Sequence, residues 1–255
     1  FFGKESYSTA IQNDYRRLKG FRDVRRGDAV VFCFPNGDTV MSKRPADDYH
    51  AYVRWYGADK VEEHFGPLIV RPSDKKDHYV KRCVAVAGDT IVVRNGLVYV
   101  NSEKQTVYPG VQLSYKVVAN GQRLNSRTLE KLGLNLGETY FDPNLPGYPS
   151  MCLTAAMLDQ LKGSQGVVSI SENLLDDASQ DDYGIFPFSD RYEWTRDFFG
   201  PLWVPQKDVT VALDTTTLPL YERIISAYEH NDLKVDSDGV IYINGEKAQS
   251  YTFKQ

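Results

Sequence analysis

The residue best suited to chemistry is Lys81, which lies in the mostly apolar segment 79–87 just before Gly88 and Asp89. Burying an ammonium group among apolar neighbours is costly unless its charge is paired or lost. A lysine that loses its proton becomes a base, and a fall of two or three units from a pKa of about 10.4 is within the range for buried lysines. Such a base can activate a hydroxyl group, which is a weak nucleophile until its proton is removed. A lysine in such a segment is therefore a candidate for a general base.

A second segment, 25–35, has the same design, because Gly27 and Asp28 give a turn signal and an apolar strand ending at a proline follows. In this order the two segments resemble two signature boxes of the type I signal peptidases, the membrane-bound Ser/Lys proteases that remove secretory leaders. The similarity continues at 89–96 and 240–245, which both end in Asn-Gly. It covers about half of the chain.

The resemblance implies roles for the matching residues. In that family the lysine of the Lys-Arg signature is the general base, and this role falls to Lys81. Arg82 and the turn at Gly88 and Asp89 match as structural members of the site. The pattern alone would instead favour a solvated lysine on an edge strand, where lysine discourages aggregation.

The resemblance also implies a substrate. The residues just before the lysine help to form shallow pockets for small side chains, and these are Tyr79 and Val80. The partner would be the signal-peptide region of a secretory preprotein, laid along a sheet edge as an added strand. Ala85 and Ala87 stand where the family often has Gly and Pro, which could alter the following turn. Neither a metal nor another cofactor is expected.

The sequence does not show the nucleophile. The family places a Ser-Met pair upstream of the first Gly-Asp strand, after a membrane span, whereas Ser6, Ser8 and Thr9 lack the following methionine. The Gly-Asp-Asn box that ends the family's catalytic domain is also missing. We therefore expect a fragment that carries the base without the nucleophile and is inactive alone. Ser150 precedes a methionine, but its context favours an ordinary strand residue.

The expected function is the extracytoplasmic part of an endopeptidase that cleaves signal peptides, held at the inner (plasma) membrane by an anchor outside the chain. One alternative is a non-catalytic β-domain for peptide binding or scaffolding, in which Lys81 is solvated. A self-cleaving relative of the SOS-type repressors is another, although the sequence shows no DNA-binding region. The net charge of -4 and the lack of a basic stripe argue against a nucleic-acid partner.

Composition is that of an ordinary globular protein, with 42% hydrophobic and 25% charged residues. No apolar run approaches the roughly 18 residues that cross a bilayer. Cys33 and Cys83 lie in apolar strands and are expected to be buried free thiols, and Cys152 adds no metal-binding spacing. The four histidines likewise lack such spacing.

The predicted fold is mainly β with an α+β insertion. Residues 1–105 and 206–255 are expected to form an antiparallel β-rich catalytic core similar to that of the signal peptidases, and 106–205 an inserted domain. Within the core, 38–42 is a candidate hairpin partner of the first strand. Residues 46–66 show helical spacing.

Two further local patterns are clear. A strong turn signal at Asn95 and Gly96 predicts a hairpin over 89–101. The insertion shows the order β-α-β-β-α-β, which is typical of a ferredoxin-like unit. Its predicted elements are a strand at 113–118, a helix at 126–132, strands at 139–141 and 151–153, a helix at 154–162 and a strand at 167–171.

Overall fold

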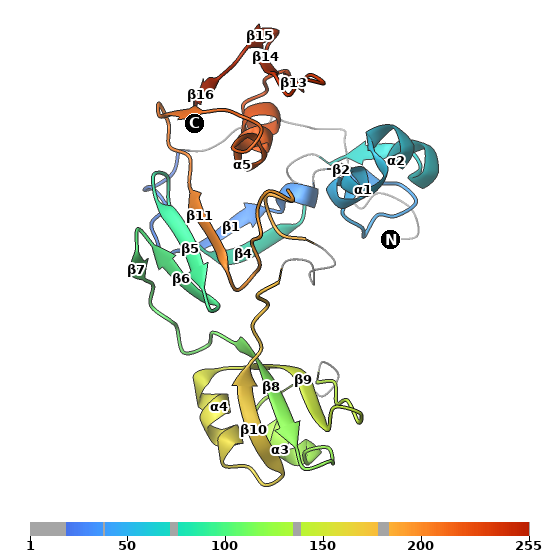
Figure 1. The fold of residues 1–255 in the computed structure, drawn as a ribbon, viewed down its shortest axis with the longest axis vertical. Coiled ribbons are helices and arrows are strands. Elements are labelled where there is room, and N and C mark those ends of the chain that lie inside the picture. The colour runs from blue at the N-terminus through green and yellow to red at the C-terminus, as the bar shows by residue number, and fades with distance from the viewer. Residues whose placement is uncertain (1–18, 38, 72–75, 135–138, 178–183, 255) are drawn as a thin grey trace. The chain divides into compact units, whose positions relative to one another are not determined.

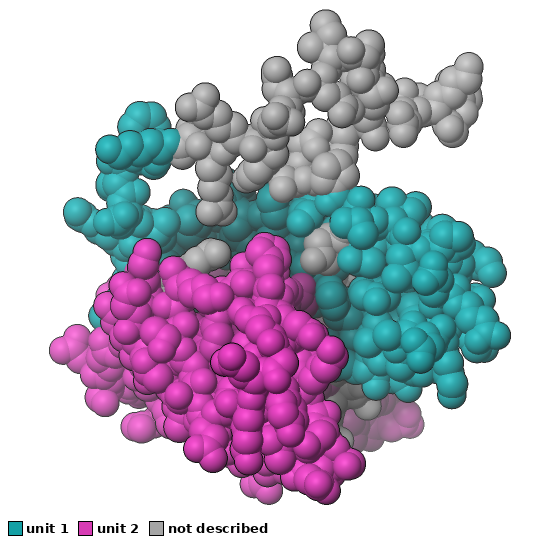
Figure 2. Space-filling view, turned by 90° about the horizontal axis from the view of Figure 1, so that it is seen from above, with its two compact units in different colours: residues 1–84 teal, residues 85–255 magenta. Residues whose placement is uncertain are grey.

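The structure, a computed structural model, describes residues 19–37, 39–71, 76–134, 139–177 and 184–254. The chain divides into two compact units, residues 1–84 and 85–255, coloured teal and magenta in Figure 2. Every strand pair in both units is antiparallel, and the predicted β-rich fold is confirmed.

The described part of the first unit contains two strand pairs and two helices (Figure 1). Its elements are β1 (Ala29–Cys33), β2 (Thr39–Met41), α1 (Tyr49–Tyr56), α2 (Ala58–Phe65), β3 (Leu68–Val70) and β4 (His78–Arg82). β1 pairs with β4, and β2 pairs with β3. The prediction that 38–42 forms a hairpin with the first strand is therefore wrong. A 3-10 turn at Pro35–Gly37 follows β1 in place of a two-residue hairpin turn.

The predicted helical segment is confirmed as two short helices. Asp48 caps α1 by accepting hydrogen bonds from the N–H groups of His50 and Ala51. Gly57 ends α1 and precedes α2 with a φ of 84°, a conformation that glycine adopts without a steric penalty. Each helix has eight residues, so the pair depends on packing contacts for its stability.

The second unit contains a four-stranded sheet in the order β11-β5-β6-β7. Its strands are β5 (Thr90–Arg94), β6 (Leu97–Val100), β7 (Glu103–Lys104) and β11 (Phe199–Trp203). Asn95 and Gly96 join β5 to β6 with φ values of 51° and 71°, as expected for a two-residue hairpin turn. The predicted hairpin is confirmed.

The region 113–172 forms a separate sheet in the order β10-β8-β9 (Figure 1). Its elements are β8 (Leu113–Ala119), α3 (Ser126–Lys131), β9 (Gly147–Leu153), α4 (Ala155–Lys162) and β10 (Val167–Glu172). Three strands and two helices are described, so the ferredoxin-like arrangement is not confirmed. Asn125 caps α3 and Thr154 caps α4 through side-chain hydrogen bonds.

The predicted strand at 139–141 does not form. Asp142 and Gly147 exchange backbone hydrogen bonds of 2.8 and 3.3 Å, which start a ladder along β9. The next hydrogen-bonded pair of an antiparallel ladder would join Tyr140 to Pro149, two residues further on each side. Proline has no N–H to donate, and the pairing stops there.

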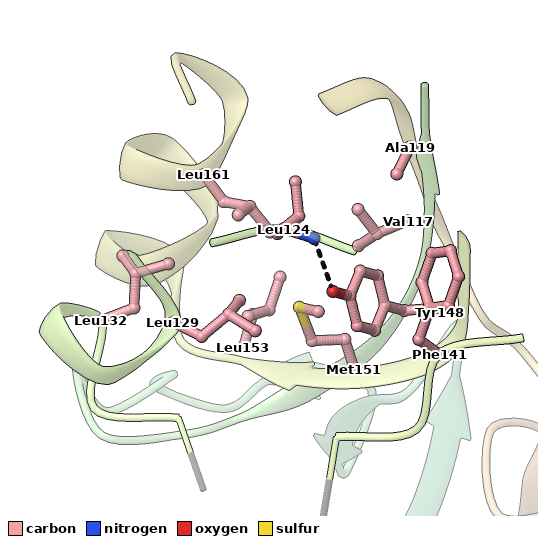
Figure 3. Packing of buried hydrophobic residues seen from close by; sticks show 10 residues of the cluster. All are labelled: Val117, Ala119, Leu124, Leu129, Leu132, Phe141, Tyr148, Met151, Leu153 and Leu161. Carbon is pink, nitrogen blue, oxygen red and sulfur yellow. Dashed lines mark hydrogen bonds between the residues drawn. The ribbon is translucent and has the colours of Figure 1, made fainter. Parts of the chain in front are cut away.

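The core of this region lies between the sheet and its two helices (Figure 3). Leu129 of α3 and Leu161 of α4 point toward Met151 and Leu153 of β9 (Figure 3). The hydroxyl of Tyr148 accepts a hydrogen bond of 2.9 Å from the backbone N–H of Leu124. This bond satisfies a polar group that would otherwise be costly to bury.

The remaining residues of the second unit form two small sheets and a helix. These elements are β12 (Thr210–Ala212), α5 (Leu218–Arg223), β13 (Leu233–Val235), β14 (Ile241–Ile243), β15 (Glu246–Lys247) and β16 (Ser250–Thr252). Helix α5 continues as a π-helical turn over Ile224–Tyr228. Phe253 and Ile225 are fully buried at its core. Among the described residues, no helix has the length and apolarity needed to cross a membrane.

Candidate active site

Lys81 lies on β4, opposite Val30 of β1. Because side chains alternate along a strand, Tyr79 and Lys81 share one face of the pair while Val80 and Arg82 share the other. The Nζ atom of Lys81 lies 5.9 Å from the ring centroid of Tyr79, at the outer limit of a cation–π contact. The ring of Tyr79 stacks on Phe34 at 4.7 Å. The lysine thus lies near the ring of Tyr79, which is itself packed against Phe34.

The side chain of Lys81 is exposed, as are all five residues of β4. The burial expected for a neutral lysine is therefore not provided by the described residues of the first unit. The physical reason is that a two-stranded sheet has no layer of its own to cover either face. In the described parts of the chain, Lys81 forms no ion pair, so no carboxylate holds its charge.

Arg82 ties β4 to the first Gly-Asp turn. Its Nη1 atom donates a hydrogen bond of 2.5 Å to the carbonyl of Gly27. The backbone N–H of Gly27 donates a hydrogen bond of 2.7 Å to the carbonyl of Cys83. The backbone N–H of Cys83 donates one of 2.8 Å to the carbonyl of Asp28. The turn and the end of the lysine strand are thus held together by three hydrogen bonds.

The two Gly-Asp turns have the same geometry. In each turn the aspartate carboxylate accepts the N–H of the residue three positions earlier, Arg25 for Asp28 and Val86 for Asp89, at 2.9 and 2.8 Å. The glycine in each turn has a positive φ, 88° for Gly27 and 87° for Gly88. This left-handed conformation explains why glycine precedes the aspartate.

The partners of the two carboxylates differ. Arg22 contacts Asp28 through two nitrogens at 2.6 and 2.9 Å, a bidentate pair. The hydrogen bond from Arg22, followed by that from the N–H of Arg25, lowers the pKa of Asp28 to about 2. Asp89 is buried and accepts a hydrogen bond of 2.9 Å from the amide of Asn101.

Sequence analysis did not single out Arg22 or Asn101. No spacing rule links Arg22 to a turn six residues later. Asn101 could have been found, because the hairpin register set by Asn95 and Gly96 places it opposite Thr90 and beside Asp89. The predicted site residues therefore lie in two places: Tyr79, Val80, Lys81 and Arg82 on β4 of the first unit, and Gly88 and Asp89 in the second.

The hydroxyl nucleophile is not identified by the structure. Ser6, Ser8 and Thr9 lie outside the described residues. Ser150 lies in β9, where its hydroxyl is 3.0 Å from that of Ser114, as expected for an ordinary strand residue. Within the described ranges, no three His, Cys, Asp or Glu side chains gather to hold a metal ion.

The cysteines differ partly from expectation. Cys33 and Cys83 are half-buried rather than buried, because no described strand or helix forms a second layer over the β1–β4 pair, and Cys152 is exposed. None of the three forms a disulfide with another described residue. Cys33 contacts His78 on the opposite strand, with 3.8 Å between Sγ and Nε2.

Comparison with known proteins bears on this arrangement. The family model described as "Signal peptidase, peptidase S26" matches residues 3–138, which include both Gly-Asp turns and the whole of β4. The chain belongs to the type I signal peptidase family. A curated relative, "Signal peptidase I" of Bacillus amyloliquefaciens, is 25% identical over 123 residues, which is 48% of this chain and 56% of the relative. The chain thus spans little more than half the length of this signal peptidase. No solved structure matches the present chain.

Proposed function

We propose that this chain is part of an endopeptidase that removes signal peptides from secretory preproteins, with Lys81 as its general base. The observation that supports the proposal is the family match, whose range of residues 3–138 includes the Lys-Arg strand and the Gly-Asp turn on each side of it in sequence. Family members act on secretory leaders at a membrane, and we extend this location to the extracytoplasmic face. The nucleophilic serine and the anchor would come from parts of the full-length protein other than the described residues.

The geometry of β4 suits an extended substrate. The backbone carbonyl of Asp77 accepts a hydrogen bond from the N–H of Phe34, and the backbone carbonyl of Asp28 accepts one from the N–H of Cys83. These two bonds fix the hydrogen-bonding pattern of the β1–β4 pair. Because these groups alternate along a strand, the N–H and C=O groups of Lys81 point toward β1. Those of Val80 point away from it. A leader segment added along this edge would bond to the backbone of Val80.

The chemistry would follow the Ser/Lys scheme. Neutral Lys81 accepts the proton of the serine hydroxyl as its oxygen attacks the scissile carbonyl. The ammonium group then gives that proton to the leaving amine, and an acyl-enzyme remains. In the second half, Lys81 takes a proton from water as the water oxygen attacks the acyl-enzyme carbonyl. Collapse of this adduct releases the cleaved leader with a new carboxyl terminus, and Lys81 returns the proton to the serine oxygen. A neutral lysine in the cleavage step requires a cover for β4 that the residues described in the first unit do not supply.

The exposure of Lys81 supports a second candidate, a non-catalytic β-domain that binds peptides. The two functions are separated by Lys81→Ala in the full-length protein, assayed on a preprotein. The proposed activity requires loss of cleavage with an unchanged unfolding temperature. Lys104→Ala, an exposed strand lysine in β7, is the matched control and should cleave normally. Normal turnover by Lys81→Ala would remove the assigned role and leave peptide binding.

A further inference from the structure

The aromatic ring of Tyr79 lies beside the proposed base on the β1–β4 pair (Figure 1). Its centroid is 5.9 Å from the Nζ atom of Lys81, on the same face of the pair. Side chains on one face of an extended peptide are about 7 Å apart. A peptide that is cut at Lys81 therefore places a side chain next to the cut within reach of this ring. Tyr79 is 41% exposed, so its ring is accessible to such a side chain.

A second ring fixes the position of Tyr79. The centroid of Phe34 lies 4.7 Å from that of Tyr79, and the two planes are 23° apart, which makes a stacked pair. Phe32 lies directly opposite Tyr79 in the register, so Phe34 reaches Tyr79 diagonally across the two strands. Lys81 lies opposite Val30, in the other direction along the same face. Tyr79 therefore lies between Phe34 and Lys81 along this face.

Phe34 is itself anchored. Its backbone N–H donates a hydrogen bond of 2.8 Å to the carbonyl of Asp77, and its carbonyl accepts one of 3.1 Å from the N–H of Gly37. A Cβ atom added at Gly37 would lie 3.4 Å from the Cδ1 atom of Phe34, so the turn packs closely against the phenyl ring. The ring of Phe34 therefore contacts both this turn and Tyr79.

We propose that Phe34 determines which side chain is accepted next to the scissile bond, because it holds the ring of Tyr79 close to Lys81. Non-bonded carbon atoms contact at about 3.5–4.0 Å. A gap of 5.9 Å between the ring and the amine therefore excludes a branched or aromatic side chain and admits a small one. The inference rests on the proposed function and deepens it by naming a residue that selects the substrate. Phe34 acts through Tyr79, so it is a positioning residue.

Loss of the Phe34 ring should widen this gap. Tyr79 would lose its stacking partner, and its exposed ring could move into the vacated space. A stacked aromatic pair contributes about a two- to twelvefold preference for one arrangement. An apolar pocket discriminates about 10- to 200-fold per methylene group. Removal of the stack should therefore reduce the selection for small side chains without abolishing it.

The alternative is that the stack is ordinary cross-strand packing. It would then stabilise the β1–β4 pair and leave the choice of substrate untouched. The two roles differ in what a variant changes. A structural role alters the unfolding temperature and the overall rate, whereas a role in specificity alters the ratio of kcat/KM between two substrates that differ in one side chain.

The test uses the full-length protein and two preproteins that carry alanine or valine directly before the cut. Phe34→Ala should lower the preference for alanine by three- to tenfold, mainly by accepting valine better. Phe34→Tyr keeps an aromatic ring and should keep the preference within twofold. Tyr56→Ala is the matched control, because it removes a ring contact of 5.7 Å with Phe65 in the same unit. Its preference should equal that of the parent.

A double-mutant cycle tests whether Phe34 acts through Tyr79. In a Tyr79→Ala background, Phe34→Ala should change the preference by less than twofold. If Phe34→Ala does not fold, Phe34→Leu removes the stack with less loss of apolar volume and should shift the preference in the same direction.

The outcomes separate this inference from the proposed function. A parent that cleaves neither preprotein would overturn the proposed function, and the role of Phe34 with it. A parent that cleaves, with the same preference in the variants that lack the ring of Phe34, would overturn the role of Phe34 alone. An equal effect of Phe34→Ala with and without the ring of Tyr79 would also overturn it.

Discussion

The side-chain amide of Asn101 bridges the second Gly-Asp turn and the hairpin that follows it. Its Nδ2 donates to the buried carboxylate of Asp89 at 2.9 Å, and its Oδ1 accepts the N–H of Thr90 at 2.8 Å. One side chain thus fixes both the turn that belongs to the family signature and the start of β5. Removing this side chain should therefore lower the stability of the fold more than its exposed position near β7 suggests.

We expect Asn101→Gly to lower the free energy of unfolding by about 1–2 kcal/mol, because it removes two hydrogen bonds around a buried carboxylate. Glycine tolerates the φ of 51° at this position, so the change isolates the side chain from backbone strain. Urea denaturation measures the effect. Glu103→Gln on the adjacent exposed strand is the control and should change stability by less than about 0.5 kcal/mol. Equal stability of Asn101→Gly and the parent would contradict the bridge.

The Arg22–Asp28 pair should make stability depend on pH in the acid range. The pKa of Asp28 is lowered to about 2, first by the hydrogen bond from Arg22. Because the folded-state pKa lies below the unfolded value, the stabilisation is present above about pH 4 and is lost as pH falls toward 2. Denaturation of the parent and of Arg22→Gln between pH 6 and 2 should give a shallower pH dependence for the variant. Identical slopes would show that Arg22 does not hold this carboxyl.

Tyr251 should produce the opposite dependence in the alkaline range. Burial, followed by the hydrogen bond that its hydroxyl donates to Glu229, raises its pKa to about 12. A raised pKa means that the folded state keeps its proton longer, so this contribution is complete below about pH 10 and is lost as pH rises toward 12. Absorbance titration of the phenol, compared with Tyr251→Phe, identifies the group, and denaturation at pH 9, 10.5 and 11.5 measures the loss. A phenol titrating near pH 10 would refute the assignment.

The local features of the fold could be predicted from sequence because short-range chemistry determines them. Glycine before aspartate gave both signature turns, Asn95 and Gly96 gave the hairpin, and Thr154 gave the start of α4. Each depends on the conformational preference of one or two residues or on a single cap. The family could be recognised for the same reason, since its boxes are short and contiguous.

Long-range pairing could not be predicted in this way. The partner of β1 is β4, almost fifty residues later, while the nearer candidate β2 pairs with β3. The loss of the strand at 139–141 depends on the position of Pro149 across the ladder. The exposure of Lys81 depends on what lies over β4 in space. The apolar residues that neighbour Lys81 in sequence do not determine how exposed its side chain is.

The amide of Phe34 and the carbonyl of Asp77 are joined by a hydrogen bond of 2.8 Å. The chain therefore leaves the lysine-bearing strand pair and returns to it at almost the same point. The intervening segment carries α1, α2 and the β2–β3 pair. Its two ends are held together by this hydrogen bond. Loop-closure entropy changes only slowly with length, so such a segment can be shortened or exchanged at modest cost. The region 35–76 is therefore the natural place to graft a foreign module or a reporter without rebuilding the strand that carries Lys81.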